Sequence, residues 1–296
     1  MKVMKLNKRT KILLSVLQEM GGNLSDFRMQ RLLCLYCTEF VKNGDYYEFI
    51  HLGKSPYSLQ AGEDKKSLIK NKLLERSDDW ILTQTEKRFA VELDFFEKMA
   101  LQDLRNKFFQ ASDEDLEKSI IYDENPSFLE ADEIIFYTIG YEGLSPEAYI
   151  NLLLQNKVRL LVDVRKNAYS QKYGFSKTEL RENLGLVGIE YIHLPELGII
   201  SEKRKELNYE QDYADLFVEY EQTTLKNSQN ELAKLQSLLE KKRCIAITCF
   251  EADHNHCHRS RVANALKARG GFNYKIEHLQ PCKHSKNHKL NEKKFL

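Results

Sequence analysis

The chain has 296 residues, of which 42% are hydrophobic and 30% charged, so it can bury the cores of two ordinary domains. This composition excludes a disordered or low-complexity chain, and the net charge of +1 excludes a globally basic or acidic protein. The longest apolar runs are too short to span a membrane, and the basic N-terminal stretch lacks the apolar core of a secretory leader. The six cysteines form no dense disulfide framework, which is typical of a reducing compartment. We therefore expect a cytoplasmic protein with no membrane partner.

Residues 1–115 are expected to form a helix-rich first domain. Apolar side chains repeat at helical spacing, Gly21-Gly22 can end the first helix, and Ser25 can cap the second. The expected elements are, in order, helices over 12–20 and 25–40, a turn at 54–58, a helix that includes 68–74, and a short strand at 80–83. This order favours a winged-helix-like module that binds nucleic acid or protein. An all-helical dimerisation module is the alternative.

The turn in this domain also resembles a known group. Its sequence SPYS is similar to the GPYS of the Panacea-type antitoxin domains, with Ser55 in place of Gly. That resemblance covers about 60 residues.

Residues 116–133 are acidic, contain Pro126 and are expected to be a linker to a second domain over 134–296. Short apolar strands alternate with amphipathic helices in this second domain. The strands are expected at 136–139, 160–164, 190–194, 244–249 and 276–279, with helices at 146–154, 178–186, 212–239 and 260–268. The alternation predicts an α/β fold, a Rossmann-like open and mostly parallel sheet with helices on both faces.

Carboxylates collect where these strands end, which is the edge at which such sheets bind ligands. Glu142 follows the first strand, Asp163 ends the second, and Glu251 follows the fourth. Each is a candidate catalytic carboxylate, able to activate water or stabilise a cation. For Asp163 the alternative is a structural anchor that pairs with Arg165 or Arg259, because an unpaired carboxylate in an apolar strand end is costly.

Candidate substrate-binding groups stand beside these carboxylates. A guanidinium can hold phosphate in a bidentate fashion, a helix N-terminus attracts anions, and an aromatic ring can stack on a base. The candidates are Arg165, Arg259, His258, Tyr141 and Tyr169. For Arg259 the alternative is a structural pair with Asp163 or Glu251 that holds the loop.

Cysteine and histidine chemistry offers further interpretations. Possible ligands occur at 249, 254, 256, 257, 258, 282, 284 and 288, but their spacing matches no standard zinc motif, so we expect no metal and no cofactor, with structural zinc as the alternative. Cys34 and Cys37 have a C-x-x-C spacing within an apolar helix, which favours packing. A nucleophilic Cys249 is disfavoured because the loop after it is too long to cradle an anion tightly. The lysine-rich tail over 283–295 is expected to be solvated, with contact to a phosphate backbone as the alternative.

Four sequence blocks resemble the domain of unknown function 488. They are TIGYEG, LVDVR, YIHLPELG and CFEADHNHCHR, and they occur in the family's order across about 134–280. The resemblance implies a Rossmann-like α/β domain. It carries over, as matched motif positions, Asp163, Arg165, Cys249, Glu251, Cys257, His258 and Arg259.

The leading hypothesis for function is a nucleic-acid-directed hydrolase. By analogy with nucleotide-processing α/β folds, a carboxylate would promote hydrolysis of an N-glycosidic bond, as in a DNA base-excising glycosylase of bacterial defence or repair. One alternative is a non-catalytic DNA-binding regulator that senses a phosphorylated ligand. A second is a thiol- or metal-dependent enzyme that uses Cys249 and Cys257. The expected partner is nucleic acid, with DNA as the leading choice, and the sequence predicts no oligomeric state.

Overall fold

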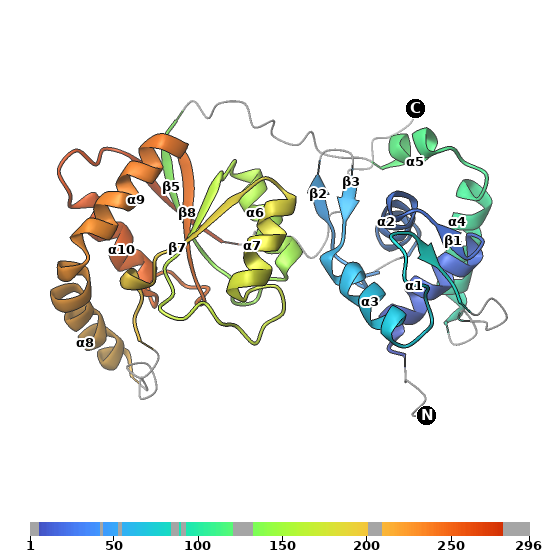
Figure 1. Ribbon diagram of the computed structural model, residues 1–296, viewed down its shortest axis with the longest axis horizontal. Coiled ribbons are helices and arrows are strands. Elements are labelled where there is room, and N and C mark those ends of the chain that lie inside the picture. Colours follow the sequence, from blue (N-terminus) through green and yellow to red (C-terminus); the bar gives the residue numbers. More distant parts are fainter. Residues whose placement is uncertain are drawn as a thin grey trace. The chain divides into compact units, whose positions relative to one another are not determined.

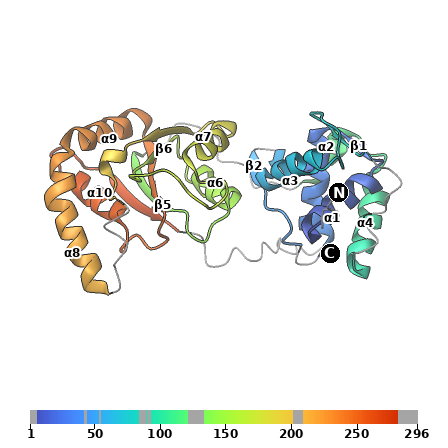
Figure 2. The same cartoon turned by 60° about the horizontal axis from the view of Figure 1, so that its bottom comes forward.

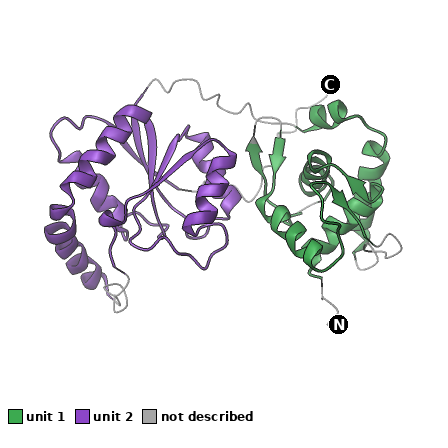
Figure 3. Cartoon of the chain, viewed as in Figure 1, with its two compact units in different colours: residues 1–127 green, residues 128–296 purple. Residues whose placement is uncertain are grey.

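The protein divides into two compact units, residues 1–127 and 128–296, in a computed structural model (Figure 3). The structure describes residues 6–41, 44–52, 55–83, 89, 93–120, 133–200 and 209–280. The division falls between the expected boundaries at 115 and 134. Helix α5 (Asp113–Ser119) occupies the start of the segment expected to be a linker, because Ser112 and Asp115 form a capping box there. Pro126 and the tail over 283–295 lie outside the described residues.

The first unit is helix-rich with two small antiparallel sheets. Its elements are α1 (Lys8–Glu19), β1 (Asn23–Leu24), α2 (Asp26–Leu35), a π-helical turn (Tyr36–Phe40), β2 (Ile50–Leu52), β3 (Ser55–Tyr57), α3 (Leu59–Lys70), β4 (Trp80–Ile81), α4 (Phe95–Phe108) and α5. Ser25 caps α2 by accepting from the Arg28 amide, as its position predicts. β1 pairs with β4, and Trp80 is fully buried in the core.

The expected turn at 54–58 is wrong over its described residues. Ser55–Tyr57 forms β3, which pairs antiparallel with β2, and Pro56 lies opposite His51. Ser58 then caps α3 through the Ala61 amide, so this helix begins at Leu59 and ends at Lys70 rather than reaching residue 74. The cause is local pairing, because β2 ends at Leu52 and β3 begins at Ser55, so residues that by themselves read as a turn are extended by pairing with the preceding segment. The winged-helix-like assignment stays a prediction.

The second unit confirms the predicted α/β class. Its elements are β5 (Ile135–Gly140), α6 (Pro146–Gln155), β6 (Leu160–Asp163), α7 (Lys177–Leu186), β7 (Glu190–His193), α8 (Glu210–Tyr220), α9 (Gln229–Lys242), β8 (Cys244–Cys249), α10 (His258–Lys267) and β9 (Lys275–Leu279). The strands form one all-parallel sheet in the order β7-β6-β8-β5-β9. Helices α6 and α7 cover one face, and α9 and α10 cover the other (Figures 1 and 2).

The apolar sequence of the central strands follows from this two-sided cover. Every residue of β6 and β8 is buried, which is typical of parallel strands between two helical layers. All five strands run in the same direction, so their carboxyl ends lie at one edge of the sheet. Within the described residues, no helix is both long and apolar enough to cross a membrane.

Candidate functional site

A buried ion pair ends strand β6. Asp163 is 0% exposed, and its carboxylate accepts hydrogen bonds from the Arg165 amide at 3.0 Å, from Arg165 Nε at 2.9 Å and Nη2 at 2.6 Å, and from the Tyr191 hydroxyl at 2.7 Å. Burial lowers the pKa of Arg165, but the hydrogen bonds and charge of Asp163 more than offset this, and the net pKa is raised. Both oxygens of Asp163 are therefore engaged within the protein, as in the structural-anchor alternative.

The ring of Tyr141 is enclosed at the same edge. It stacks on Phe175, with centroids 4.4 Å apart and planes at 10°, and its edge meets Phe250. Its hydroxyl accepts from Arg165 Nη1 at 2.8 Å. Tyr141 thus fixes Arg165, and both ring and guanidinium are buried. The other aromatic candidate, Tyr169, is 68% exposed.

Arg259 fastens the loop that follows β8. Its side chain is 1% exposed and donates to the backbone carbonyl of Glu251 and, at 2.8 Å, to that of Ala252. The same loop presses on Gly140, where a β-carbon would lie 1.8 Å from the Glu251 carbonyl oxygen. These hydrogen bonds hold the loop, as the alternative for Arg259 expected, but they reach backbone carbonyls rather than the carboxylate of Asp163 or Glu251.

Glu142 is the one exposed side chain among the three candidate carboxylates. One of its oxygens accepts from the Ala252 amide at 2.9 Å. Lys172 reaches the same strand end, where its ammonium donates to the Tyr141 carbonyl at 3.1 Å. Partial burial lowers the pKa of Lys172, and the charge of Glu142 opposes that effect.

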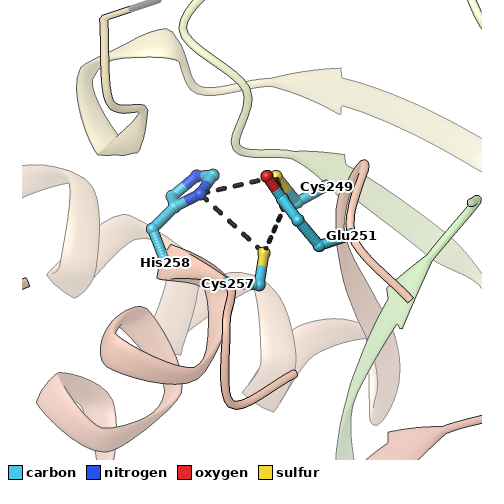
Figure 4. A group of neighbouring side chains, drawn as sticks. All are labelled: Cys249, Glu251, Cys257 and His258. Carbon is cyan, nitrogen blue, oxygen red and sulfur yellow. Dashed lines mark hydrogen bonds between the residues drawn. The ribbon is translucent and has the colours of Figure 1, made fainter. Parts of the chain in front are cut away.

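Four side chains with metal-binding atoms converge between β8 and α10 (Figure 4). They form the cysteine cluster, which consists of Cys249, Glu251, Cys257 and His258. One donor atom from each residue lies within 4.8 Å of the others. Glu251 Oε2 accepts from Cys249 Sγ at 3.0 Å and from Cys257 Sγ at 2.9 Å. His258 Nδ1 lies 3.4 Å from Cys249 Sγ and 3.9 Å from Cys257 Sγ.

Three of the four residues of the cluster are shielded from solvent, and Glu251 is half-buried. Cys249, Cys257 and His258 are at most 2% exposed, and Tyr220 of α8 covers the His258 ring edge-on at 5.9 Å between centroids. Burial above all raises the pKa of the Cys257 thiol well above its usual range, while the charge of Arg259 acts to lower it. Thiolate, imidazole and carboxylate are all zinc ligands, so these four residues could hold a metal ion.

A cationic cavity of about 300 Å³ lies at the ends of β6 and β7. It is lined by Lys166 and Tyr169 after β6, by Lys177 at the start of α7, and by His193 at the end of β7. His193 Nε2 lies 2.8 Å from the Arg165 carbonyl oxygen and therefore donates to it, which leaves Nδ1 to accept from Lys177 Nζ at 3.3 Å. None of the described residues that line this cavity is Asp or Glu.

Sequence reasoning did not select Lys166, Lys177 or His193. The available signal was their position, because two lysines and a histidine follow or begin elements at the carboxyl edge of the sheet. Their convergence depends on β6 and β7 being neighbours, with Asp163 paired opposite His193.

The other cysteine and histidine candidates lie elsewhere. Cys34 and Cys37 are buried free thiols of the first unit, and burial raises the pKa of Cys34 to about 12, which agrees with packing rather than reactivity. The ring of His254 stacks on His278 at 3.8 Å, and His256 lies 3.4 Å from Asp253. Positions 282, 284 and 288 are outside the described residues.

Comparison with known proteins gives one match. Residues 145–266 match the family model described as Domain of unknown function DUF488, and the first unit is unassigned. No curated protein and no solved structure matches the chain.

Proposed function

Residues 145–266 form a DUF488 domain, whose description names no reaction, and from its site we propose that this protein is a nucleic-acid-binding regulator that senses a phosphorylated ligand. The ligand belongs to the nucleotide class and occupies the cationic cavity at the ends of β6 and β7.

The charge of the cavity is the observation that carries this proposal. Lys166 and Lys177 bring two ammonium groups to its wall, and His193 adds an imidazole. Because no described lining residue is Asp or Glu, nothing acidic in the wall repels a phosphate. The exposed ring of Tyr169 stands at the same cavity and offers a surface on which a base can stack.

The same geometry weighs against Asp163 as a catalytic base. A base must reach the water or proton that it takes up, and both oxygens of Asp163 are occupied by Arg165 and Tyr191 inside the protein. Glu251 faces the two cysteine thiols. A sensor needs neither carboxylate to be free.

One observation favours the hydrolase as a second candidate. Glu142 is exposed at the carboxyl end of β5, and the loop after β6 reaches the same place through Lys172. Because β8 lies between β6 and β5, a nucleotide held in the cavity by its phosphate would have to extend across the end of β8 to reach Glu142. In that function Glu142 promotes hydrolysis of the N-glycosidic bond.

The regulatory function also gives the first unit a task. Its succession of helices with the β1–β4 pair is compatible with a winged-helix-like unit, which would hold the protein on DNA. The concentration of the nucleotide would then set how much of the protein carries ligand in its second unit.

The test measures thermal stabilisation of the full chain by nucleoside monophosphates and by short single- and double-stranded oligonucleotides. Lys166→Ala and Lys177→Ala each remove a charge-assisted contact, so each should weaken binding about tenfold. Lys234→Ala removes an exposed lysine of α9 and should leave binding unchanged. Stabilisation that the two cavity variants do not reduce contradicts the proposed pocket.

Base release separates the two candidate functions. The wild-type chain is incubated with normal and modified DNA, and free base is measured by mass spectrometry. A sensor releases none. Release that Glu142→Gln abolishes while nucleotide binding persists would replace the sensor with the hydrolase.

A further inference from the structure

We propose that the cysteine cluster binds a structural Zn²⁺ ion. The proposal concerns a site separate from the cationic cavity and does not depend on the proposed function.

The donor spacing agrees with a tetrahedral ion. With metal–sulfur bonds of about 2.3 Å and metal–nitrogen or metal–oxygen bonds of about 2.0 Å, neighbouring donors lie about 3.5 Å apart. The sulfur–oxygen and sulfur–nitrogen distances in the cluster run from 2.9 to 3.9 Å. All donor pairs lie within 4.8 Å, so an ion at the centre requires the widest pairs to move closer together.

The imidazole is oriented as a ligand. His258 Nε2 lies 3.1 Å from the Val164 carbonyl oxygen, so this nitrogen carries the ring proton and donates a hydrogen bond to that oxygen. Nδ1 therefore presents its lone pair to the two sulfur atoms. A backbone carbonyl that fixes the tautomer through the other ring nitrogen is the usual second contact of a metal-binding histidine.

The charges around the cluster suit a divalent cation. Two thiolates and a carboxylate around Zn²⁺ leave one negative charge, which is costly in a buried place unless it is compensated. The buried guanidinium of Arg259, in the first turn of α10, donates to the Glu251 carbonyl oxygen, and its positive charge acts on Cys257. The cluster also adjoins the first residues of α10, where the helix dipole favours negative charge.

Four protein ligands make this a closed site, which indicates a structural ion rather than a catalytic one. The ligands come in two pairs, one from the end of β8 and one from the start of α10, so the ion would join these elements. Through His258 it would also hold Val164, which lies between Asp163 and Arg165.

The experiment measures metal content of the purified full chain after incubation with Zn²⁺ and desalting. We expect close to one zinc ion per chain, and cobalt in its place should give the thiolate-to-metal absorption of a tetrahedral site. Cys257→Ser should retain less than about a tenth of the zinc that the wild type retains. Cys244→Ser, at the far end of β8, is the matched control and should bind like the wild type.

X-ray absorption on the zinc-loaded wild type keeps the proposal testable if Cys257→Ser does not fold. It should show two sulfur and two lighter ligands. The proposal would be overturned if the wild type retained neither zinc nor cobalt. It would also be overturned by a disulfide between Cys249 and Cys257 in freshly purified protein, or by a folded Cys257→Ser that retains zinc like the wild type. None of these outcomes bears on nucleotide binding.

Discussion

Asp163 illustrates how a residue with catalytic chemistry can serve the fold. Its carboxylate neutralises Arg165 in a place where neither charge reaches water. Removing one partner of such a pair leaves the other buried and uncompensated, and this cost exceeds the net value of the pair itself. If a substitution of Asp163 abolishes activity, the first explanation to test is therefore a loss of folded structure rather than the loss of a catalytic group.

Asp163→Asn should destabilise the protein by about 3–5 kcal/mol, because the guanidinium of Arg165 loses its counter-charge. Urea unfolding measures this change. Asp215→Asn, at an exposed position of α8, is the control and should stay within about 0.5 kcal/mol of the wild type. A folded Asp163→Asn with wild-type stability would show that the pair is not a structural anchor.

The stacked rings of His254 and His278 predict a dependence of stability on pH. Burial is the main cause that lowers the pKa of both, and the positive charge of Arg259 lowers both further, whereas Asp253 opposes the shift at His254. In the unfolded chain a histidine takes up its proton near pH 6.5. The unfolded chain therefore binds more protons below that pH, so the free energy of unfolding should fall as pH drops from about 7 to 5.

Replacing His278 by Gln tests this dependence. Glutamine does not titrate but can keep a hydrogen bond to Thr138, which lies 2.8 Å from His278 Nδ1. Unfolding measured at both pH values should show a smaller loss of stability in His278→Gln than in the wild type. An identical loss in both proteins would assign the pH dependence to other groups.

At the scale of elements, the end of β5 depends on the absence of a side chain. The loop after β8 crosses Gly140 so closely that the Glu251 carbonyl oxygen occupies the place of a β-carbon. The contact is with backbone, which cannot rotate away as a side chain can. The close approach sets the position of Glu251 and, with it, of the cysteine cluster.

Gly140→Ala should therefore cost about 1–3 kcal/mol and shift the loop. Gly185→Ala is the matched control, because this helical glycine of α7 has open space around it and alanine should stabilise the helix by about 0.5–1 kcal/mol. Thermal unfolding compares the two. Equal effects would contradict the close contact at Gly140.

The elements of the second unit were predictable because their patterns are local. Buried strands such as β8 are continuous apolar runs, and Ser145 with Pro146 signals the start of α6. The pairing of β3 with β2 is also local, but Ser55, Pro56 and Ser58 are typical turn residues, and they favoured a turn over the strand that the structure has.

The sequence singled out Cys249, Cys257 and His258 as possible metal ligands but not their convergence with Glu251. Their spacing matches no standard zinc motif, and the loop between β8 and α10 has to fold back before the four donors meet. The cationic cavity likewise required knowledge of which strands are neighbours.

At the scale of the whole molecule, we propose different tasks for the two units. In this proposal the second unit binds a phosphorylated ligand at the edge of its sheet, and the first unit binds nucleic acid. This proposal depends on the recognition of phosphate by the cavity that contains Lys166 and Lys177.

Calorimetric titration of the full chain with matched nucleosides and nucleoside monophosphates tests this recognition. We expect that the monophosphate binds with measurable heat and that the corresponding nucleoside binds at least about tenfold more weakly. Added salt should narrow this difference in affinity. Equal affinity for both members of each pair, or binding of neither, would contradict recognition of a phosphorylated ligand.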